Sequence, residues 1–319
     1  MHPALSVIVF TVASGAGYGM LIIVSALSLL GWSRPVIDQG IAARWHGIAE
    51  LVVALGMAGL GLFASTFHLG RRERAWRAFS QWRSSWLSRE GIVSLATFAP
   101  ALAFAWVRYT EGVVRGPWQL APAGCLAGAV ATLVCTGMIY ASLKPIRQWR
   151  DPRVVPAYVA LALASGAVMT LLVGWAFGAP PNAALTAFAV AALIGAAAVK
   201  LSYWRAIDRG RSASTTASAI GLNEATSARL LDPPHTGTNY LLEEMGFRVA
   251  RKHALTLRRA ALVVGFVLPA ILVVVAHAAG ALAVAVAVVA NLVGTAIERW
   301  LFFAEATHTV TLYYGARAV

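Results

Sequence analysis

Charged residues and cysteines are both scarce in this 319-residue sequence. Charged residues form 12% of it, about half of the share of roughly 25% found in soluble domains. A soluble enzyme is thereby excluded, because so few charged side chains cannot cover a water-facing surface of this size. The two cysteines, Cys125 and Cys135, share one apolar run and lack the spacing that binds zinc or an iron–sulfur cluster. Any redox metal is therefore expected in a partner protein.

Histidine is missing from the places where a haem-binding membrane helix needs it. None of the seven histidines lies in the middle of an apolar run, whereas membrane electron carriers commonly hold haem iron between histidines inside the bundle. His46 and His277 both lie near the outer ends of apolar runs and could in principle pair. No haem is expected, although a haem held between His46 and His277 stays open as an alternative.

Long apolar runs dominate what is present, with 59% hydrophobic residues and a mean hydropathy of +0.70. A helix needs roughly 20 apolar residues to cross about 30 Å of hydrocarbon. Eight stretches qualify, namely 5–30, 48–67, 92–109, 121–143, 155–177, 183–204, 260–279 and 281–304. The first lacks a basic leader and is too long for a signal peptide, so we expect it to be retained. The sequence predicts an all-α, polytopic membrane bundle of eight transmembrane helices, a single membrane domain over residues 1–319.

Basic charge is distributed unequally between the two sides of this bundle. The chain has 26 Lys+Arg residues against 13 Asp+Glu, a net charge of +13. The sides are set by the eight spans, and four basic residues lie on one side: Arg34, Arg44, Arg108 and Arg115. The other 22 of the 26 share a side with both termini. By the positive-inside rule, both termini are cytoplasmic in a bacterial inner membrane, and the partner of the basic charge is membrane lipid rather than nucleic acid.

Two cytoplasmic segments are longer than plain connectors. Segment 68–90 mixes arginines with Trp76, Phe79, Trp82 and Trp86 at helical steps, which predicts an amphipathic helix in the membrane interface. Segment 206–259 is the longest hydrophilic stretch and carries apolar and turn residues. It is interpreted either as a docking loop for a soluble partner or as a loop that packs on itself.

Ionisable residues near membrane depth gather at the cytoplasmic edge, where each is a candidate for function. His68 ends the second run and Glu90 opens the third. An imidazole and a carboxylate can exchange protons with a redox ligand. Glu50 lies one helical turn from His46 near the outer edge, where an interfacial pair is favoured over a proton route.

The last run ends in a further group of ionisable residues, made up of Glu298, Arg299, Glu305 and His308. Arg299 could neutralise either carboxylate, since Glu298 and Glu305 are two helical turns apart. The group is therefore a possible proton path or a structural pair that fixes helix packing.

Three short motifs resemble the membrane anchor subunits of dimethyl sulfoxide reductase-type molybdopterin oxidoreductases. His-Leu-Gly at 68–70 ends the second run, Arg-Ala-Phe follows at 77–79, and Ser-x-Glu at 88–90 opens the third. Segments 230–253 and 298–306 are similar to the branch that anchors cytoplasmic sulfite-oxidising enzymes. The charge distribution favours that branch, because the sulfoxide reductase branch carries its catalytic subunits in the periplasm.

The resemblance implies a three-subunit complex and a quinone site in this chain. A molybdopterin catalytic subunit and an iron–sulfur electron-transfer subunit would dock on the cytoplasmic face and hold the molybdopterin and iron–sulfur clusters. This chain, non-catalytic alone and with no metal site, would pass electrons from sulfite oxidation to ubiquinone or menaquinone. The family's quinone histidine and glutamate match His68 and Glu90. Arg71 and Arg89 would orient quinone oxygens, with Trp76 or Trp86 beside the ring.

Three other functions remain open at this point. A quinol-oxidising anchor of a sulfoxide reductase-type terminal reductase would use the same site in the opposite electron direction. A solute transporter is disfavoured, because transporters tend to show repeats and midplane charge. A purely structural anchor, with electrons passing elsewhere, is the third.

Overall fold

A computed structural model of the chain describes residues 4–31, 41–68, 71–178, 182–210, 214–222, 228, 231–232 and 253–314. In the first half, α1 (Leu5–Leu29), α2 (Ile41–Ser65), α3 (Trp86–Ala96), α4 (Phe98–Thr110) and α5 (Leu120–Ala141) follow one another. The second half contains α6 (Val154–Ala176), α7 (Ala183–Arg209), α8 (Thr216–Ala219), α10 (Ala254–Leu262), α11 (Leu268–Ala279) and α12 (Ala281–Ala304). Short 3₁₀ turns are η1 (Thr66–His68), η2 (Arg72–Phe79), η3 (Gly116–Gln119) and η6 (Thr309–Tyr314).

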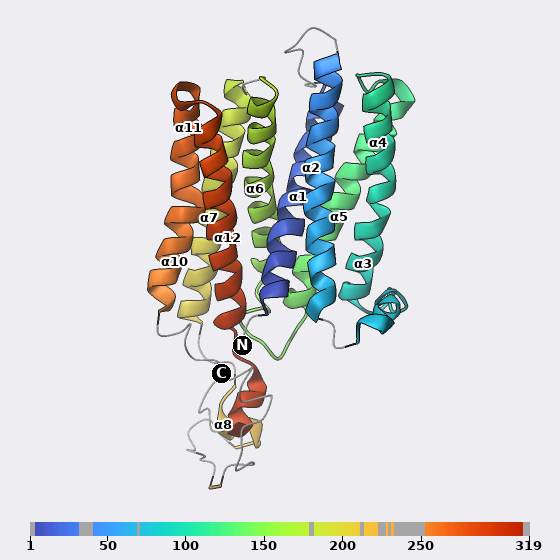
Figure 1. Ribbon diagram of the computed structural model, residues 1–319. Helices are drawn as coiled ribbons and strands as arrows, with labels where there is room; N and C mark the ends of the chain where they lie inside the picture. Colours follow the sequence, from blue (N-terminus) through green and yellow to red (C-terminus); the bar gives the residue numbers. More distant parts are fainter. Residues whose placement is uncertain are drawn as a thin grey trace.

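Eight helical stretches of the described residues are long and apolar enough to cross a membrane, which confirms the predicted all-α bundle. Three of them are built from more than one element: α3 continues into α4, η3 continues into α5, and α10 continues through η5 (Val263–Val267) into α11. The helices stand side by side in Figure 1, and the first and last described residues lie at the same end. That end is called the terminal end below.

Proline explains why two of the spans are interrupted. Pro269 cannot donate a backbone hydrogen bond to the Gly265 carbonyl one turn earlier, and η5 is a π-helical turn at that point. The Asn291 side chain of α12 donates to this carbonyl at 2.8 Å. In the same way, Pro100 follows the break between α3 and α4 at Thr97. Neighbouring side chains can thus satisfy backbone groups that proline releases inside a membrane.

Helix α1 lies at the centre of the bundle and touches α2, α5, α6 and α12 (Figure 1). Its glycines allow backbones to meet, because a Cβ on Gly19 would lie 1.8 Å from the Ala162 carbonyl oxygen of α6. Gly166 of α6 faces Gly19 in turn. Small residues at such crossings are a common means of helix association in lipid.

The connection between α5 and α6 ties the terminal end together. Gln148 donates to the Thr307 hydroxyl at 2.6 Å, and Ile146 forms an isolated antiparallel bridge with His308. Tyr203 of α7 donates to the Gln148 carbonyl at 2.9 Å. These contacts join the α5–α6 connection both to the segment after α12 and to α7.

The two predicted cytoplasmic segments are only partly helical where they are described. Segment 68–90 is divided into η2, a turn and the start of α3, rather than forming one continuous helix. Of segment 206–259, α7 extends to Arg209 and α10 begins at Ala254, with the short α8 between them. Most of the predicted docking loop lies outside the described residues.

Candidate functional site

The most deeply buried charges of the described residues form a triad near the terminal end. Lys200 of α7 lies 2.5 Å from Glu298 of α12, and Arg299 binds the same carboxylate with two nitrogens at 2.5 and 2.9 Å. The three side chains are 2% exposed or less. Charges this far from water are stable only when paired, since desolvation of each ion is costly.

This arrangement shows where Lys200 lies and which carboxylate Arg299 binds. The charge count places Lys200 among the residues that orient the protein, but Lys200 is buried inside α7 and pairs with α12. A charge within an apolar run is itself a signal of a site, and that signal is present in the sequence. Of the two carboxylates open to Arg299, the partner is Glu298, while Glu305 binds Arg258 at 2.9 Å.

Aromatic rings enclose the cations of the triad. The Arg299 guanidinium lies over the Tyr158 ring at 4.2 Å, and Lys200 lies over the Tyr203 ring at 4.0 Å. Phe302 contacts both cations from α12 itself. Cation–π contacts of this kind stabilise desolvated cations that have too few carboxylates nearby. With one carboxylate between two basic side chains, the aromatic rings supply contacts that the carboxylate alone does not.

Glu90 forms a second buried site, at the start of α3. It is 4% exposed and accepts a short hydrogen bond from the Thr136 hydroxyl of α5. In the described part of the chain, no basic side chain lies within salt-bridge distance of this carboxylate. A buried carboxyl group without a counter-charge inside a membrane span is a candidate for proton exchange.

The segment before Glu90 is held in place by backbone contacts. Arg89 donates to the carbonyls of Trp82 and Arg83 at 2.9 and 2.7 Å, and its guanidinium lies 4.4 Å from the centre of the Trp86 ring. Ser88 donates a short hydrogen bond to the Ala78 carbonyl. These bonds dock η2 and the following turn against the first turn of α3, beside Glu90.

The other predicted quinone residues lie on the same segment. The backbone of His68 closes η1, while its side chain is outside the described residues. Arg71 and Trp76 are exposed, and Trp86 is half-buried. Of the predicted set, the structure thus buries Glu90 alone among the described side chains. Thr136, its partner, was missed by sequence reasoning because a threonine in an apolar helix gives no distinctive signal.

A third cluster lies at the terminal end, where α7 and α12 end and α10 begins. Arg258 of α10 bridges Asp208 at 2.7 Å and Glu305 at 2.9 Å, beside an open cavity of about 360 Å³. Burial raises the pKa of the Glu305 carboxyl above its ordinary value, even though Arg258 acts in the opposite direction. Partial burial lowers the pKa of the His308 imidazole, whose Nδ1 accepts from the Val310 backbone at 3.0 Å. Glu305 thus pairs with Arg258 and His308 bonds to the backbone just after it, while the choice between a proton path and a structural pair stays a prediction.

A fourth group lies at the opposite end of the bundle. His46 and Glu50 approach to 3.6 Å one turn apart, which confirms the predicted pair. Arg108 of α4 is buried beside Gly47, where a Cβ would lie 2.4 Å from its Nε. His46 contacts the Phe177 ring, whereas His277 of α11 lies 3.4 Å from the Thr186 hydroxyl.

Eight apolar spans that enclose paired charges and a buried carboxyl group define a multi-pass helical membrane protein with an ionisable interior. The chain belongs to the DMSO reductase anchor subunit (DmsC) family, which matches residues 1–315. It is also 33% identical, over 330 aligned positions covering all of both chains, to the C subunit of sulfite dehydrogenase from Allochromatium vinosum. Membership confirms the resemblance found in the motifs around His68 and Glu90.

Proposed function

We propose that this chain is the quinone-binding membrane anchor of a three-subunit oxidoreductase that oxidises sulfite. A molybdopterin subunit and an iron–sulfur subunit dock on its cytoplasmic face, and electrons pass from them to ubiquinone or menaquinone in the inner membrane. Family membership supports the anchor role, and the relative named as part of a sulfite dehydrogenase supports the substrate.

The buried carboxyl group of Glu90 is the observation that carries the quinone site. Reduction of a quinone consumes two electrons and two protons, so the site needs a group that transfers protons next to the ring oxygens. Glu90 is buried, bonded to Thr136 and adjacent to the half-buried Trp86. Its lack of a described basic partner suits proton exchange better than a structural salt bridge.

The remaining predicted residues divide into two roles. His68 is the second candidate for proton exchange, with Arg71 and Trp76 on the same exposed segment. The donors of Arg89 are engaged by the carbonyls of Trp82 and Arg83, which supports a positioning role for Arg89 rather than direct contact with quinone oxygens.

The test compares Glu90→Gln and His68→Ala with the exposed control Glu73→Gln in the purified complex. We expect Glu90→Gln to lower sulfite-dependent quinone reduction by about 100-fold, the loss typical of a removed proton-transfer group. Sulfite oxidation with a soluble artificial acceptor should be unchanged, because that reaction bypasses the anchor. If both variants reduce quinone at the wild-type rate, the site assignment is wrong.

The opposite electron direction is the second candidate, and the name of the family favours it. In that case the same residues would take protons from quinol and feed a terminal reductase. The purified complex distinguishes the two directions: sulfite-dependent reduction of quinone supports the first, and quinol oxidation coupled to a sulfoxide without sulfite activity supports the second.

A further inference from the structure

Segment 72–85, which contains η2 and the turn after it, is fixed at the terminal end beside the start of α3 (Figure 1). Three of its backbone carbonyls accept hydrogen bonds from the side chains of Ser88 and Arg89. Phe79 packs on Gly91 of α3, where a Cβ would lie 2.8 Å from the Phe79 ring. These contacts hold the backbone of the segment and leave most of its other side chains exposed.

Arginine dominates the exposed face of this segment. In a 3₁₀ helix such as η2, side chains three residues apart lie in one row, so Arg74 and Arg77 are neighbours. Both are exposed, and so is Arg83 in the following turn. Among the described residues, none of these three arginines has a carboxylate within salt-bridge distance. Their positive charge is therefore available to a partner.

Two exposed indole rings accompany the arginines. Trp76 is 64% exposed and Trp82 is 53% exposed. The Arg77 guanidinium lies 5.5 Å from the centre of the Trp76 ring, and the Arg83 guanidinium lies 5.3 Å from that of Trp82. Tryptophan and arginine are enriched in protein–protein interfaces and among the residues that contribute most to binding. The composition of this face therefore favours a protein partner.

The segment lacks the continuous apolar stripe of a helix that lies on lipid. Such a helix places its large apolar side chains on one face, toward the acyl chains. Here Phe79 packs on Gly91, and Trp86 is half-buried beside the Arg89 guanidinium at 4.4 Å. The two indoles that stay exposed lie beside arginines. This arrangement favours a protein surface over a lipid surface as the occupant.

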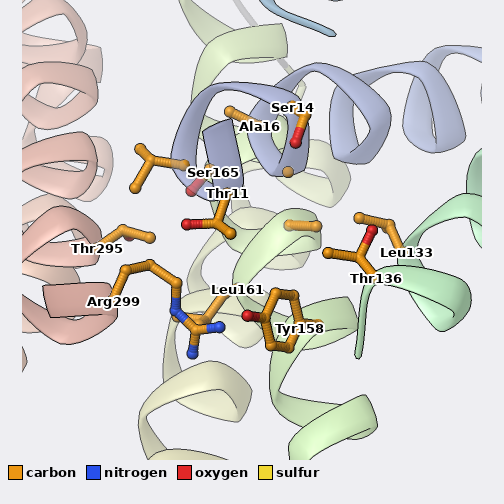
Figure 2. Close-up of a pocket in the computed structure, with 13 residues that line it drawn as sticks. Thr11, Ser14, Ala16, Leu133, Thr136, Tyr158, Leu161, Ser165, Thr295 and Arg299 are labelled. Atoms are coloured by element: carbon orange, nitrogen blue, oxygen red, sulfur yellow. The ribbon is translucent and has the colours of Figure 1, made fainter. Parts of the chain in front are cut away.

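The place of the segment suits a partner that delivers electrons near Glu90. The cavity that Thr136 lines has room for about one water centre, about 10 Å³, which is far too small for a quinone ring (Figure 2). A quinone at Glu90 therefore lies outside this cavity. Ser88 and Gly91, on either side of Glu90, both contact the segment. Because electron transfer slows steeply with distance, the subunit that reduces the quinone has to dock close by.

We propose that Arg74, Arg77, Trp82 and Arg83 form the surface on which an acidic face of the iron–sulfur subunit docks. This docking role rests on the proposed function and names the contact surface within it. Opposite charges across the interface speed association and fix the orientation of the partner. The fixed backbone lowers the entropic cost of binding. Trp76 lies beside this surface and stays a candidate for the quinone site.

The experiment uses the purified three-subunit complex in nanodiscs of neutral phosphatidylcholine and measures dissociation of the two soluble subunits as ionic strength rises. The variants are Arg74→Glu combined with Arg77→Glu, and Trp82→Ala. Arg150→Glu is the matched control, because Arg150 is exposed on the α5–α6 connection. We expect the double variant to weaken binding about 30-fold at low salt and less at high salt, where charges are screened. Trp82→Ala should weaken binding about 30-fold at both.

Each outcome supports or overturns the docking surface. Unchanged affinity of both variants would overturn it, and so would an equal loss in Arg150→Glu, which would show a general effect of charge. An effect of the arginine variants that appears only with anionic phosphatidylglycerol would assign the surface to lipid instead. Glu90→Gln should bind the soluble subunits like the wild type, so loss of quinone reduction without dissociation concerns the quinone site alone. If the wild-type chain carries no iron–sulfur subunit, the proposed function fails, and the docking surface fails with it.

Discussion

Glu298 lies between two cations, and its charge is what allows both to be buried. Lys200 and Arg299 each approach its oxygens to 2.5 Å, and the carboxylate itself has no exposed surface. Removal of one member of a buried ion group destabilises a protein more than replacement of the whole group by apolar residues. The reason is that the remaining charges stay buried without a partner. The role of Glu298 at this scale is therefore to neutralise charge and fix α7 against α12.

We expect Glu298→Gln to destabilise the protein by about 3–5 kcal/mol, since it leaves Lys200 and Arg299 buried without a counter-charge. Thermal unfolding of the purified complex measures this, with the exposed Glu111→Gln as the control. Adding Lys200→Met to Glu298→Gln should restore part of the loss, because it removes one unpaired cation. A melting temperature of Glu298→Gln equal to that of Glu111→Gln would contradict this account of the triad.

At the scale of elements, the bundle depends on close approach of α1 and α6. Gly19 and Gly166 face each other across this crossing, and a Cβ on Gly166 would lie 2.3 Å from backbone atoms of Gly19 and Met20. Backbone atoms cannot rotate away as a side chain can, so the helices would have to separate.

We expect Gly166→Ala to destabilise the bundle by about 1–3 kcal/mol, the usual cost of overpacking a tight contact. Gly195→Ala in α7 is the matched control, because a Cβ there meets nothing within 4 Å. The yield of monodisperse complex and its melting temperature in detergent are the measurements. Equal stability of the two variants would show that α1 and α6 can separate at little cost, and that the bundle does not depend on this glycine contact.

At the scale of the whole molecule, orientation follows from basic charge and from the even number of spans. The first and last described residues share one end, and α3 begins and α12 ends there (Figure 1). Glu90 lies in the first turns of α3, and Glu298 and Arg299 lie in the last turns of α12. The excess of lysine and arginine on that side predicts that it faces the cytoplasm.

We expect a membrane-impermeant thiol reagent to label Trp118→Cys in intact cells and Arg150→Cys only after lysis. The two positions lie beyond opposite ends of α5, and both are exposed. The native Cys125 and Cys135 are buried, so they contribute little background. Labelling of Arg150→Cys in intact cells would contradict the predicted topology.

The spans could be predicted from the sequence with small shifts at their ends. The predicted run 281–304 coincides with α12, whereas the run 260–279 begins late because α10 starts at Ala254. The first turns of α10 contain arginines, so a search for apolar residues places the beginning of this helix too late. The sequence could single out Glu90 and the pair His46–Glu50 because a charge at membrane depth stands out, and the role of Glu90 stays a prediction.

Apolar length and basic charge by themselves determined that this chain is an eight-span membrane bundle and predicted its orientation, because transfer into lipid depends on each segment separately. Only the tertiary structure decided that Lys200 binds Glu298 and that Arg299 pairs with Glu298 instead of Glu305. It also decided that the Thr136 hydroxyl donates a hydrogen bond to Glu90. Most of these partners come from helices far apart in the chain. Their geometry depends on which helix faces meet, and a pattern within one segment does not contain that information.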